Sequence, residues 1–205
     1  MAIPLILPEV QAVILTGGHS RRMGQTKAFL EYRGNSFVAH LLAQLQPQVS
    51  SVMIAAGQYA PQFVGLGVDV VTDTLAEAGP LAGLANALQQ ANRPWLLCVP
   101  CDNPLLPPDY AARLLQAARV HAAPLVFVRK HGRAQPLYAI LQTALLENLQ
   151  AYLQCGERKV LPWYESVGAV ALDWDDAGLA FNNLNSPDDY AAFLQAAQDG
   201  SAAVI

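Results

Sequence analysis

Charged residues are scarce in this sequence. Only 14% of its 205 residues are Asp, Glu, Lys or Arg, and the formal net charge is −4. A protein that binds nucleic acid across its surface needs clustered Lys and Arg to contact phosphates, so the composition argues against a general nucleic-acid binder. A small polyphosphate ligand remains compatible with it, because one site can be basic while the surrounding surface is not.

Cysteine is also rare, and long apolar runs are missing. Three cysteines cannot all pair within one chain, and a chain of this size needs no disulfides, so we expect reduced thiols and a cytoplasmic protein. No run reaches the roughly 18 apolar residues of a membrane span. The start, MAIPLILPEV, lacks the positive region of a signal peptide. Cys98 and Cys101 form a C-x-x-C without a second pair, and we expect both thiols to be structural.

Apolar residues, by contrast, make up 53% of the chain, which suits one domain with a full core. Strand-like runs alternate with longer helical patterns over the first 120 residues. The expected strands are 10–16, 51–56, 68–72 and 95–100, and the expected helices are 36–45, 81–91 and 108–120. This alternation predicts an α/β fold, with a mostly parallel sheet and helices on both faces.

The rest of the chain continues with a predicted hairpin, 124–129 and 136–141, that turns at His131-Gly132. Further helices are expected at 143–153 and 157–164. Ser186-Pro187-Asp188-Asp189 is a strong helix start, with a capping Ser, a Pro in the first turn and acids near the positive helix end. Ligands of parallel sheets bind beyond the carboxyl ends of the strands, so we expect the chemistry just after Thr16, Thr72 and Pro100.

The segment LTGGHSRRMGQTK, residues 15–27, follows the first predicted strand. Its glycines let the backbone approach a ligand and aim N–H groups at it, while Arg21, Arg22 and Lys27 add positive charge. These are the groups that bind a triphosphate. The spacing fits neither a Walker loop, in which Lys follows Gly directly, nor a G-x-G-x-x-G fingerprint.

Three further motifs carry polar groups at predicted strand ends or helix starts. Asp102 in PCDNP closes the strand 95–100, and one or two carboxylates suffice for Mg²⁺ when phosphates complete its shell. Asp73, followed by GPLAG at 79–83, ends another strand. The run Asn182-Asn183-Leu184-Asn185 precedes the Ser186 helix and offers amides to a ligand. Simple turn chemistry is the alternative for each motif taken alone.

Taken together, these motifs resemble the nucleotidyltransferases that mature the molybdenum cofactor, and most of all the molybdenum cofactor guanylyltransferases. LTGGHSRRMGQTK is similar to their LAGGxSxRMGxxK signature. Four more segments stand in the family's order: GPLAGL, PCDNPLLP, QCGERKV and FNNLNSPDDY. The resemblance covers nearly the whole chain. It implies a single Rossmann-like three-layer α/β domain over residues 1–205, with an NTP-binding half at about 1–120 and an acceptor-binding half at about 121–200.

The resemblance also implies an activity. GMP would pass from GTP to molybdopterin with Mg²⁺, giving molybdopterin guanine dinucleotide and pyrophosphate. It further implies transient contacts with cofactor-synthesis proteins and recipient apo-enzymes. Neither nucleic acid nor a membrane is expected as a partner.

Roles can be carried over only at matching positions. The catalytic residues would be Lys27, Asp102 and Arg22, with Asp102 also the metal ligand. Nucleotide contacts would come from Leu15, Thr16, Gly17, Gly18, Lys27, Asp73 and Asp102. The acceptor would meet Arg158, Asn183 and Asn185.

Two departures and several alternatives accompany the resemblance. The family often has Asn after the second strand, where this chain has Ala55-Ala56-Gly57, and Thr16 replaces a common Ala. Cytosine-specific relatives tend to have Ala-Gly in place of Gly17-Gly18, which favours GTP here. A CTP-dependent enzyme, a sugar-phosphate nucleotidyltransferase and a non-catalytic nucleotide-binding adaptor stay open as alternatives.

Overall fold

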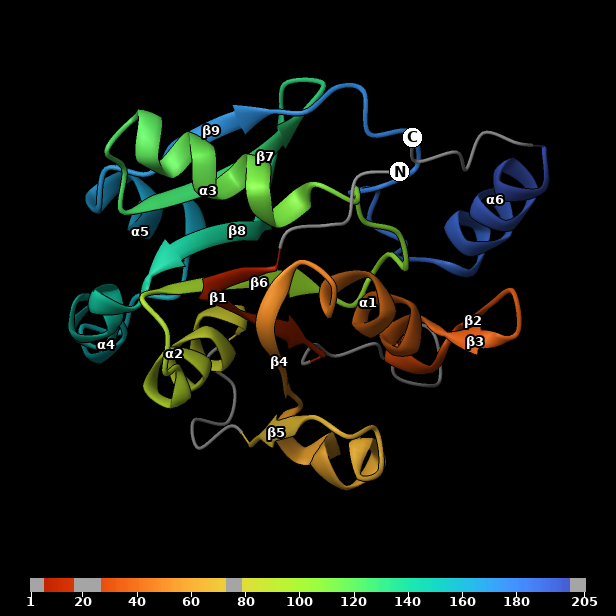
Figure 1. Ribbon diagram of the computed structural model, residues 1–205, viewed down its shortest axis with the longest axis horizontal. Coiled ribbons are helices and arrows are strands. Elements are labelled where there is room, and N and C mark those ends of the chain that lie inside the picture. Colours follow the sequence, from red (N-terminus) through yellow and green to blue (C-terminus); the bar gives the residue numbers. More distant parts are fainter. Residues whose placement is uncertain (1–5, 17–26, 73–78, 200–205) are drawn as a thin grey trace.

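The computed structural model describes residues 6–16, 27–72 and 79–199 (Figure 1). Seven strands form one sheet in the order β5-β4-β1-β6-β8-β7-β9. Their bounds are β1 Leu7–Leu15, β4 Val49–Ala55, β5 Asp69–Val71, β6 Trp95–Pro100, β7 Leu125–Lys130, β8 Arg133–Gln142 and β9 Val170–Asp173. Only β8 runs against its neighbours, so the sheet is mostly parallel, as predicted.

Helices cover both faces of the sheet. They are α1 Phe37–Leu45, α2 Pro80–Gln90, α3 Tyr110–Val120, α4 Leu146–Gln154, α5 Val160–Ser166 and α6 Pro187–Gln198. Short 3-10 turns lie at η1 Lys27–Phe29, η2 Gly57–Phe63 and η3 Thr143–Leu145. Among the described residues, no helix combines the length and the apolar composition that membrane crossing requires.

Alternation along β1 explains why the sheet has two apolar faces. Val10, Ala12 and Ile14 join the core beneath α1 and α3, while Val13 and Leu15 join the core beneath α2, α4 and α5. Successive side chains of a strand point to opposite faces, so a continuous apolar run can be buried on both. The three-layer α/β arrangement expected from the sequence is confirmed.

A third, smaller core lies away from the sheet. Phe193 of α6 packs there against Tyr32 of a two-stranded hairpin, β2 Glu31–Tyr32 and β3 Asn35–Ser36, and against Phe37 at the start of α1. The Tyr190 hydroxyl also donates 2.6 Å to the Glu31 carbonyl. In Figure 1, α6 and this hairpin lie side by side at the edge of the molecule. The C-terminal helix is therefore fixed against the segment that follows Lys27.

Local signals located most elements correctly. Ser36 caps α1, with its Oγ 3.3 Å from the Ala39 amide, and His131-Gly132 makes the β7–β8 turn with φ of 48° and 74°. Positive φ at both central residues is the type I′ geometry that tight hairpins favour. Arg33-Gly34 repeats the pattern in the β2–β3 hairpin, which the sequence analysis did not predict.

Two predicted helix starts lie too early in the sequence. The helix expected from Pro108 begins at Tyr110, with Asp109 as its N-cap, and the helix expected from Glu157 begins at Val160. The strand β9 was not predicted. It has only four residues, and it is defined by parallel pairing with β7, which lies far earlier in the sequence.

Candidate functional site

Lys27 opens η1, directly after the glycine- and arginine-rich segment. Its ammonium Nζ donates a 2.7 Å hydrogen bond to Oδ1 of Asn185, which lies 158 residues further along the chain. Lys27 is half-buried, and its carbonyl accepts the Leu30 amide at 3.0 Å. The fold thus joins two residues that the sequence placed at separate, unrelated motifs.

Asn185 is itself held in place by the start of α6. One Asp189 carboxylate oxygen accepts both the Asn185 and the Ser186 amides at 2.9 Å, and the Ser186 hydroxyl accepts the Asp189 amide at 3.1 Å. These amide donors lower the pKa of the Asp189 carboxyl. The predicted Ser186 cap is confirmed as a full capping box, and it fixes the backbone from which Asn185 reaches Lys27.

Asp102 follows the last residue of β6 by two positions, beyond the carboxyl end of the strand. Its Oδ1 accepts the Tyr138 hydroxyl at 3.0 Å, and its backbone carbonyl accepts the Leu184 amide at 3.1 Å. Burial raises the pKa of the Asp102 carboxyl, while the Lys27 charge and the Tyr138 hydrogen bond pull it down. Asp102, Lys27 and the Asn segment therefore belong to one site.

A divalent cation fits this carboxylate. The described residues hold no cluster of three or more His, Cys, Asp or Glu side chains, so a cage made only of protein ligands is not formed there. Mg²⁺ is usually bound through one or two carboxylates and the phosphates of the substrate, with water. Asp102 accepts from Tyr138 through Oδ1, and its carboxylate would be the protein ligand of such a cation.

Two buried side chains that the sequence analysis missed hold the segment leading to Asn185. Asn103, fully buried, donates 2.8 Å bonds to the carbonyls of Leu179 and Asn182. Lys130, 6% exposed at the end of β7, donates to Gly178, Ala180 and Asn182. A lysine before a hairpin turn reads as a surface charge, so no local signal pointed to this role.

Leu15 and Thr16 lie at the end of β1, as predicted, but with buried side chains. Leu15 is part of the core, and its carbonyl accepts the Cys101 amide at 3.1 Å. The Thr16 hydroxyl donates to the Ala55 carbonyl at 3.0 Å, as does the Thr16 amide. Since these groups already have partners, a nucleotide contact at Leu15 or Thr16 would have to come from remaining backbone atoms.

The predicted acceptor residues separate in the structure. Asn183 is exposed and lies in the chain between Asn182, which Asn103 contacts, and Asn185, which Lys27 contacts. Arg158 is exposed in the QCGERKV motif. Its Nη1 donates to the carbonyls of Leu153 and Glu157 at 2.7 and 2.6 Å. Arg158 therefore closes the end of α4, and its described hydrogen bonds do not join it to the Lys27–Asn185 pair.

Four predicted site residues fall outside the described part of the chain. They are Gly17, Gly18 and Arg22 of the glycine-rich segment, and Asp73 after β5. Each gap begins just after a strand of the parallel sheet, β1 or β5, and the described chain resumes at Lys27 in η1 and at Gly79 before α2. The assignments of these four residues remain predictions.

The C-x-x-C motif is structural, as expected. Cys98 and Cys101 are buried free thiols, and burial raises the pKa of Cys101 to about 12. The thiolate that redox chemistry needs is therefore disfavoured.

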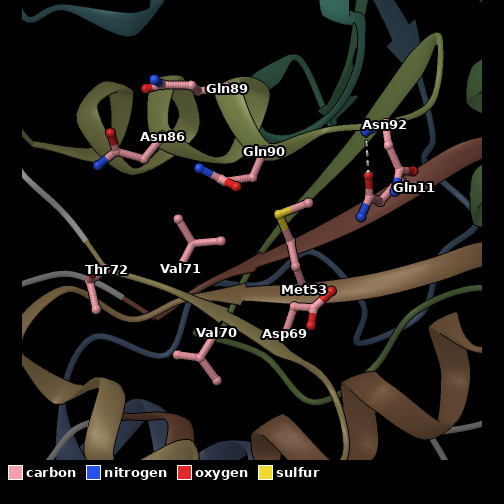
Figure 2. Close-up of a pocket in the computed structure, with 10 residues that line it drawn as sticks. All are labelled: Gln11, Met53, Asp69, Val70, Val71, Thr72, Asn86, Gln89, Gln90 and Asn92. Carbon is pink, nitrogen blue, oxygen red and sulfur yellow. Dashed lines mark hydrogen bonds between the residues drawn. The ribbon is translucent and has the colours of Figure 1, made fainter.

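A separate pocket lies on the α2 side of the sheet (Figure 2). Its volume is about 640 Å³, and its walls come from α2, the residues after it and the strands β1, β4 and β5. Figure 2 shows the carboxamides of Gln11, Asn86, Gln89 and Gln90 above Met53 and Val71. Gln11 is engaged with the chain itself, since its Oε1 accepts the Asn92 amide at 3.1 Å. Neither Lys27, Asp102 nor Asn185 lines this pocket.

Comparison with known proteins gives this arrangement its context. A family model described as the MobA-like NTP transferase domain matches residues 12–167. The chain belongs to this family. It is thus a nucleotidyltransferase, and the matched range includes Lys27, Asp102, Lys130 and Arg158, while Asn183 and Asn185 lie beyond it.

Individual members of the family agree in length and fold. The molybdenum cofactor guanylyltransferase of Acidovorax sp. (strain JS42) is 39% identical over 193 residues, covering 87% of this chain and 92% of that protein. The molybdopterin-guanine dinucleotide biosynthesis protein A of Archaeoglobus fulgidus superposes with a TM-score of 0.78 at 20% identity, covering 92% and 99% of the two chains.

A second solved structure is also similar in fold. Rv0371c of Mycobacterium tuberculosis H37Rv, described as a complex with manganese, has a TM-score of 0.67 and 16% identity, with 91% and 98% coverage. At this identity the likeness shows the shared fold alone. A divalent cation is in keeping with the MobA-like family, and the lone Asp102 carboxylate suits one.

Proposed function

We propose that this MobA-like transferase moves GMP from GTP to molybdopterin, forming molybdopterin guanine dinucleotide and releasing pyrophosphate. The observation that carries the proposal is the meeting of Lys27, Asp102 and Asn185 beyond the carboxyl end of β6. Nucleotidyl transfer to a phosphorylated acceptor can use all three groups: the ammonium as a cation, the carboxylate to bind a metal, and the amide of the C-terminal segment to contact the acceptor. The guanylyltransferase relatives supply the choice of substrates.

In this reaction an oxygen of the acceptor's terminal phosphate attacks the α-phosphorus of GTP. A new P–O bond forms on one side, and the bond to the β-phosphate oxygen breaks on the other, so that pyrophosphate leaves with the electron pair. The attacking phosphate is already an anion, and no protein base is required. Catalysis then depends on positioning and on neutralising charge, as in phosphoryl transfer generally.

Each residue has a defined task in this scheme. Asp102 would hold Mg²⁺, which when bound offsets charge on the α-phosphate and the leaving pyrophosphate. Lys27 places its ammonium at the same charges, and its bond to Asn185 limits where that ammonium can lie. Tyr138 keeps the carboxyl of Asp102 oriented and favours its ionised form. Arg22 would assist Lys27 on the phosphates.

The remaining assignments follow the family motifs. Backbone atoms of Leu15, Thr16, Gly17 and Gly18, with Asp73, would contact the nucleotide, so the NTP half is about 1–120. Arg158, Asn183 and Asn185 would face the acceptor from the half at about 121–200. Free, buried Cys98 and Cys101 suit the reducing cytoplasm in which we place the reaction. Transient contacts with cofactor-synthesis proteins and recipient apo-enzymes belong to the same proposal.

One experiment tests the function directly. The protein is incubated with molybdopterin, Mg²⁺ and each nucleoside triphosphate in turn, and the product is identified by mass spectrometry. We expect the guanine dinucleotide with GTP, and pyrophosphate in equal amount. If the cytosine dinucleotide forms with CTP instead, CTP rather than GTP is the substrate. If the protein binds GTP but forms no product in any mixture, a nucleotide-binding adaptor is favoured.

A further inference from the structure

The segment between β9 and α6 is held by one side chain at the end of β7 and one just after β6, the two strands that flank β8. From the end of β7, the Lys130 ammonium reaches the Gly178 carbonyl at 2.6 Å, the Ala180 carbonyl at 2.8 Å and Asn182 Oδ1 at 2.9 Å. Three acceptors match the three N–H donors of an ammonium. A buried lysine costs free energy unless it is satisfied in this way.

Asn103, just after β6, binds two backbone carbonyls of the same segment that Lys130 does not contact. Its Nδ2 donates to Leu179 and Asn182 at 2.8 Å, while its Oδ1 accepts the Leu105 amide. The two side chains thus engage four of the five carbonyls from residue 178 to residue 182. Between these bonds lies Phe181, fully buried with φ of 65°, a conformation that a bulky residue rarely adopts.

The same segment leads directly into the candidate site. Two residues after Asn182, the Leu184 amide donates to the Asp102 carbonyl, and the next residue, Asn185, accepts from Lys27. A displacement of the segment near Asn182 would therefore be transmitted over three residues to the Lys27 ammonium. A misplacement of about 1 Å can cost on the order of a hundredfold in rate at a preorganised site.

We propose that Lys130 and Asn103 are positioning residues that fix segment 178–185, so that Asn185 sets the place of the Lys27 ammonium. This inference rests on the proposed guanylyl transfer. Neither residue touches the reacting atoms in it; both act through the backbone of the Asn segment. The strained φ of Phe181 is the sign that tertiary contacts, rather than local preference, determine the path of the chain here.

The test uses the full-length protein and the variant Lys130→Met, which keeps the length of the side chain and removes its donors. Arg129→Met is the matched control, because Arg129 is the adjacent residue on β7 and forms an exposed ion pair with Asp173. Asn182→Ala is a milder second variant, since it removes one acceptor of Lys130 and leaves the backbone bonds in place. It keeps the proposal testable if Lys130→Met does not fold.

The first readout is hydrogen exchange, which does not depend on catalysis. We expect exchange of the amides in segment 178–185, Leu184 included, to rise at least tenfold in Lys130→Met and less in Asn182→Ala, with β1 amides unchanged. Arg129→Met should match the wild type. Unchanged exchange in the folded Lys130→Met protein, or in Asn182→Ala if the former does not fold, would overturn the proposal.

The second readout is a double-mutant cycle on the single-turnover rate. Lys130→Met should lower the rate about tenfold, but only about twofold or less when Asn185 is already Ala, because the effect passes through Asn185. Asn182→Ala should show the same non-additivity. Full, additive loss in the Asn185→Ala background would contradict the proposal. If the wild type itself makes no dinucleotide, the proposed function fails instead, and hydrogen exchange still decides whether Lys130 orders the segment.

Discussion

The Lys27 ammonium lies 2.7 Å from the Asn185 amide oxygen, although 158 residues separate the two in the chain. Lys27 comes from the end of the glycine-rich segment and Asn185 from the start of α6, so this bond joins the expected nucleotide half to the expected acceptor half.

Lys27→Ala should lower kcat more than it weakens GTP binding. The ammonium matters most where charge builds up, on the α-phosphate and the departing pyrophosphate, whereas loss of uniform binding would change KM alone. Lys27→Arg should restore only part of the rate, because a planar guanidinium cannot keep the contact with Asn185 unchanged. Calorimetry gives the affinity and single-turnover kinetics give the rate. A large loss of affinity with an untouched rate would reduce Lys27 to a tether.

Asp102→Asn should lose about two orders of magnitude or more in turnover and yet gain stability at neutral pH. Burial holds the pKa of the folded Asp102 carboxyl above its ordinary value, so the folded state binds this proton more tightly than the unfolded state. That contribution is present at low pH and is lost as pH rises through the folded pKa. Asn removes the buried charge and can still accept from Tyr138.

The stability gain should appear as a rise in Tm at neutral pH of about 2–4 °C, the shift that about 1 kcal/mol produces in a chain of this size. The loss of turnover is on the scale of removing one preorganised electrostatic group. Thermal denaturation at neutral and acidic pH provides the comparison, and the gain should shrink toward acid. Near-normal turnover at saturating Mg²⁺ would mean that another residue holds the metal.

Tyr138→Phe should move the acid limb of the pH–rate profile to higher pH. The hydroxyl donates to the Asp102 carboxylate and lowers its pKa, so removing it raises that pKa further and protonates the carboxyl at a higher pH. The rate on the alkaline side of the limb should fall less than tenfold, because the carboxylate itself remains. The pH profile of kcat/KM reports the pKa of this carboxyl in the free enzyme. If the acid limb does not move, Asp102 is not the group that controls that limb.

GTP should raise the Tm of the protein with Mg²⁺ present, and CTP should not. Gly17 has no side chain to fill the space that a purine needs, which is a steric expectation for residues outside the described part of the chain. The size of the shift follows from mass action at ligand concentrations well above Kd. Equal shifts with the two nucleotides would remove the argument for guanine selection by the glycine pair.

Arg158→Ala should raise the KM for molybdopterin severalfold and leave GTP affinity unchanged. In the described part of the chain, Arg158 donates to the end of α4 through Nη1, and its other donors can bind an anionic acceptor. Tm should fall by no more than a few degrees, as for loss of a helix-end contact. If Tm falls while the KM for molybdopterin stays constant, Arg158 is a helix-closing residue and its assignment to the acceptor site is wrong.

The amino-acid sequence by itself determined the secondary-structure elements and the strand ends at which the functional residues are expected. The β6 run from Trp95 to Pro100 was predicted with its observed bounds, and Ser36, His131-Gly132 and Ser186 marked two helix starts and a turn. Those features depend on residues within a few positions of one another: a period of two or 3.6, a side-chain cap, a positive φ. The family motifs added which strand ends carry Lys27 and Asp102.

Only the tertiary structure decided how the site is held. Asn103 meets carbonyls 76 and 79 residues away, Lys130 meets acceptors 48 to 52 residues away, and Lys27 meets Asn185 across nearly the whole chain. No local pattern encodes such contacts, because they arise from strand order and from the packing of the C-terminal segment against the sheet. The same burial makes Thr16 a partner of Ala55 and makes Lys130, which directly precedes a hairpin turn in the sequence, an interior donor.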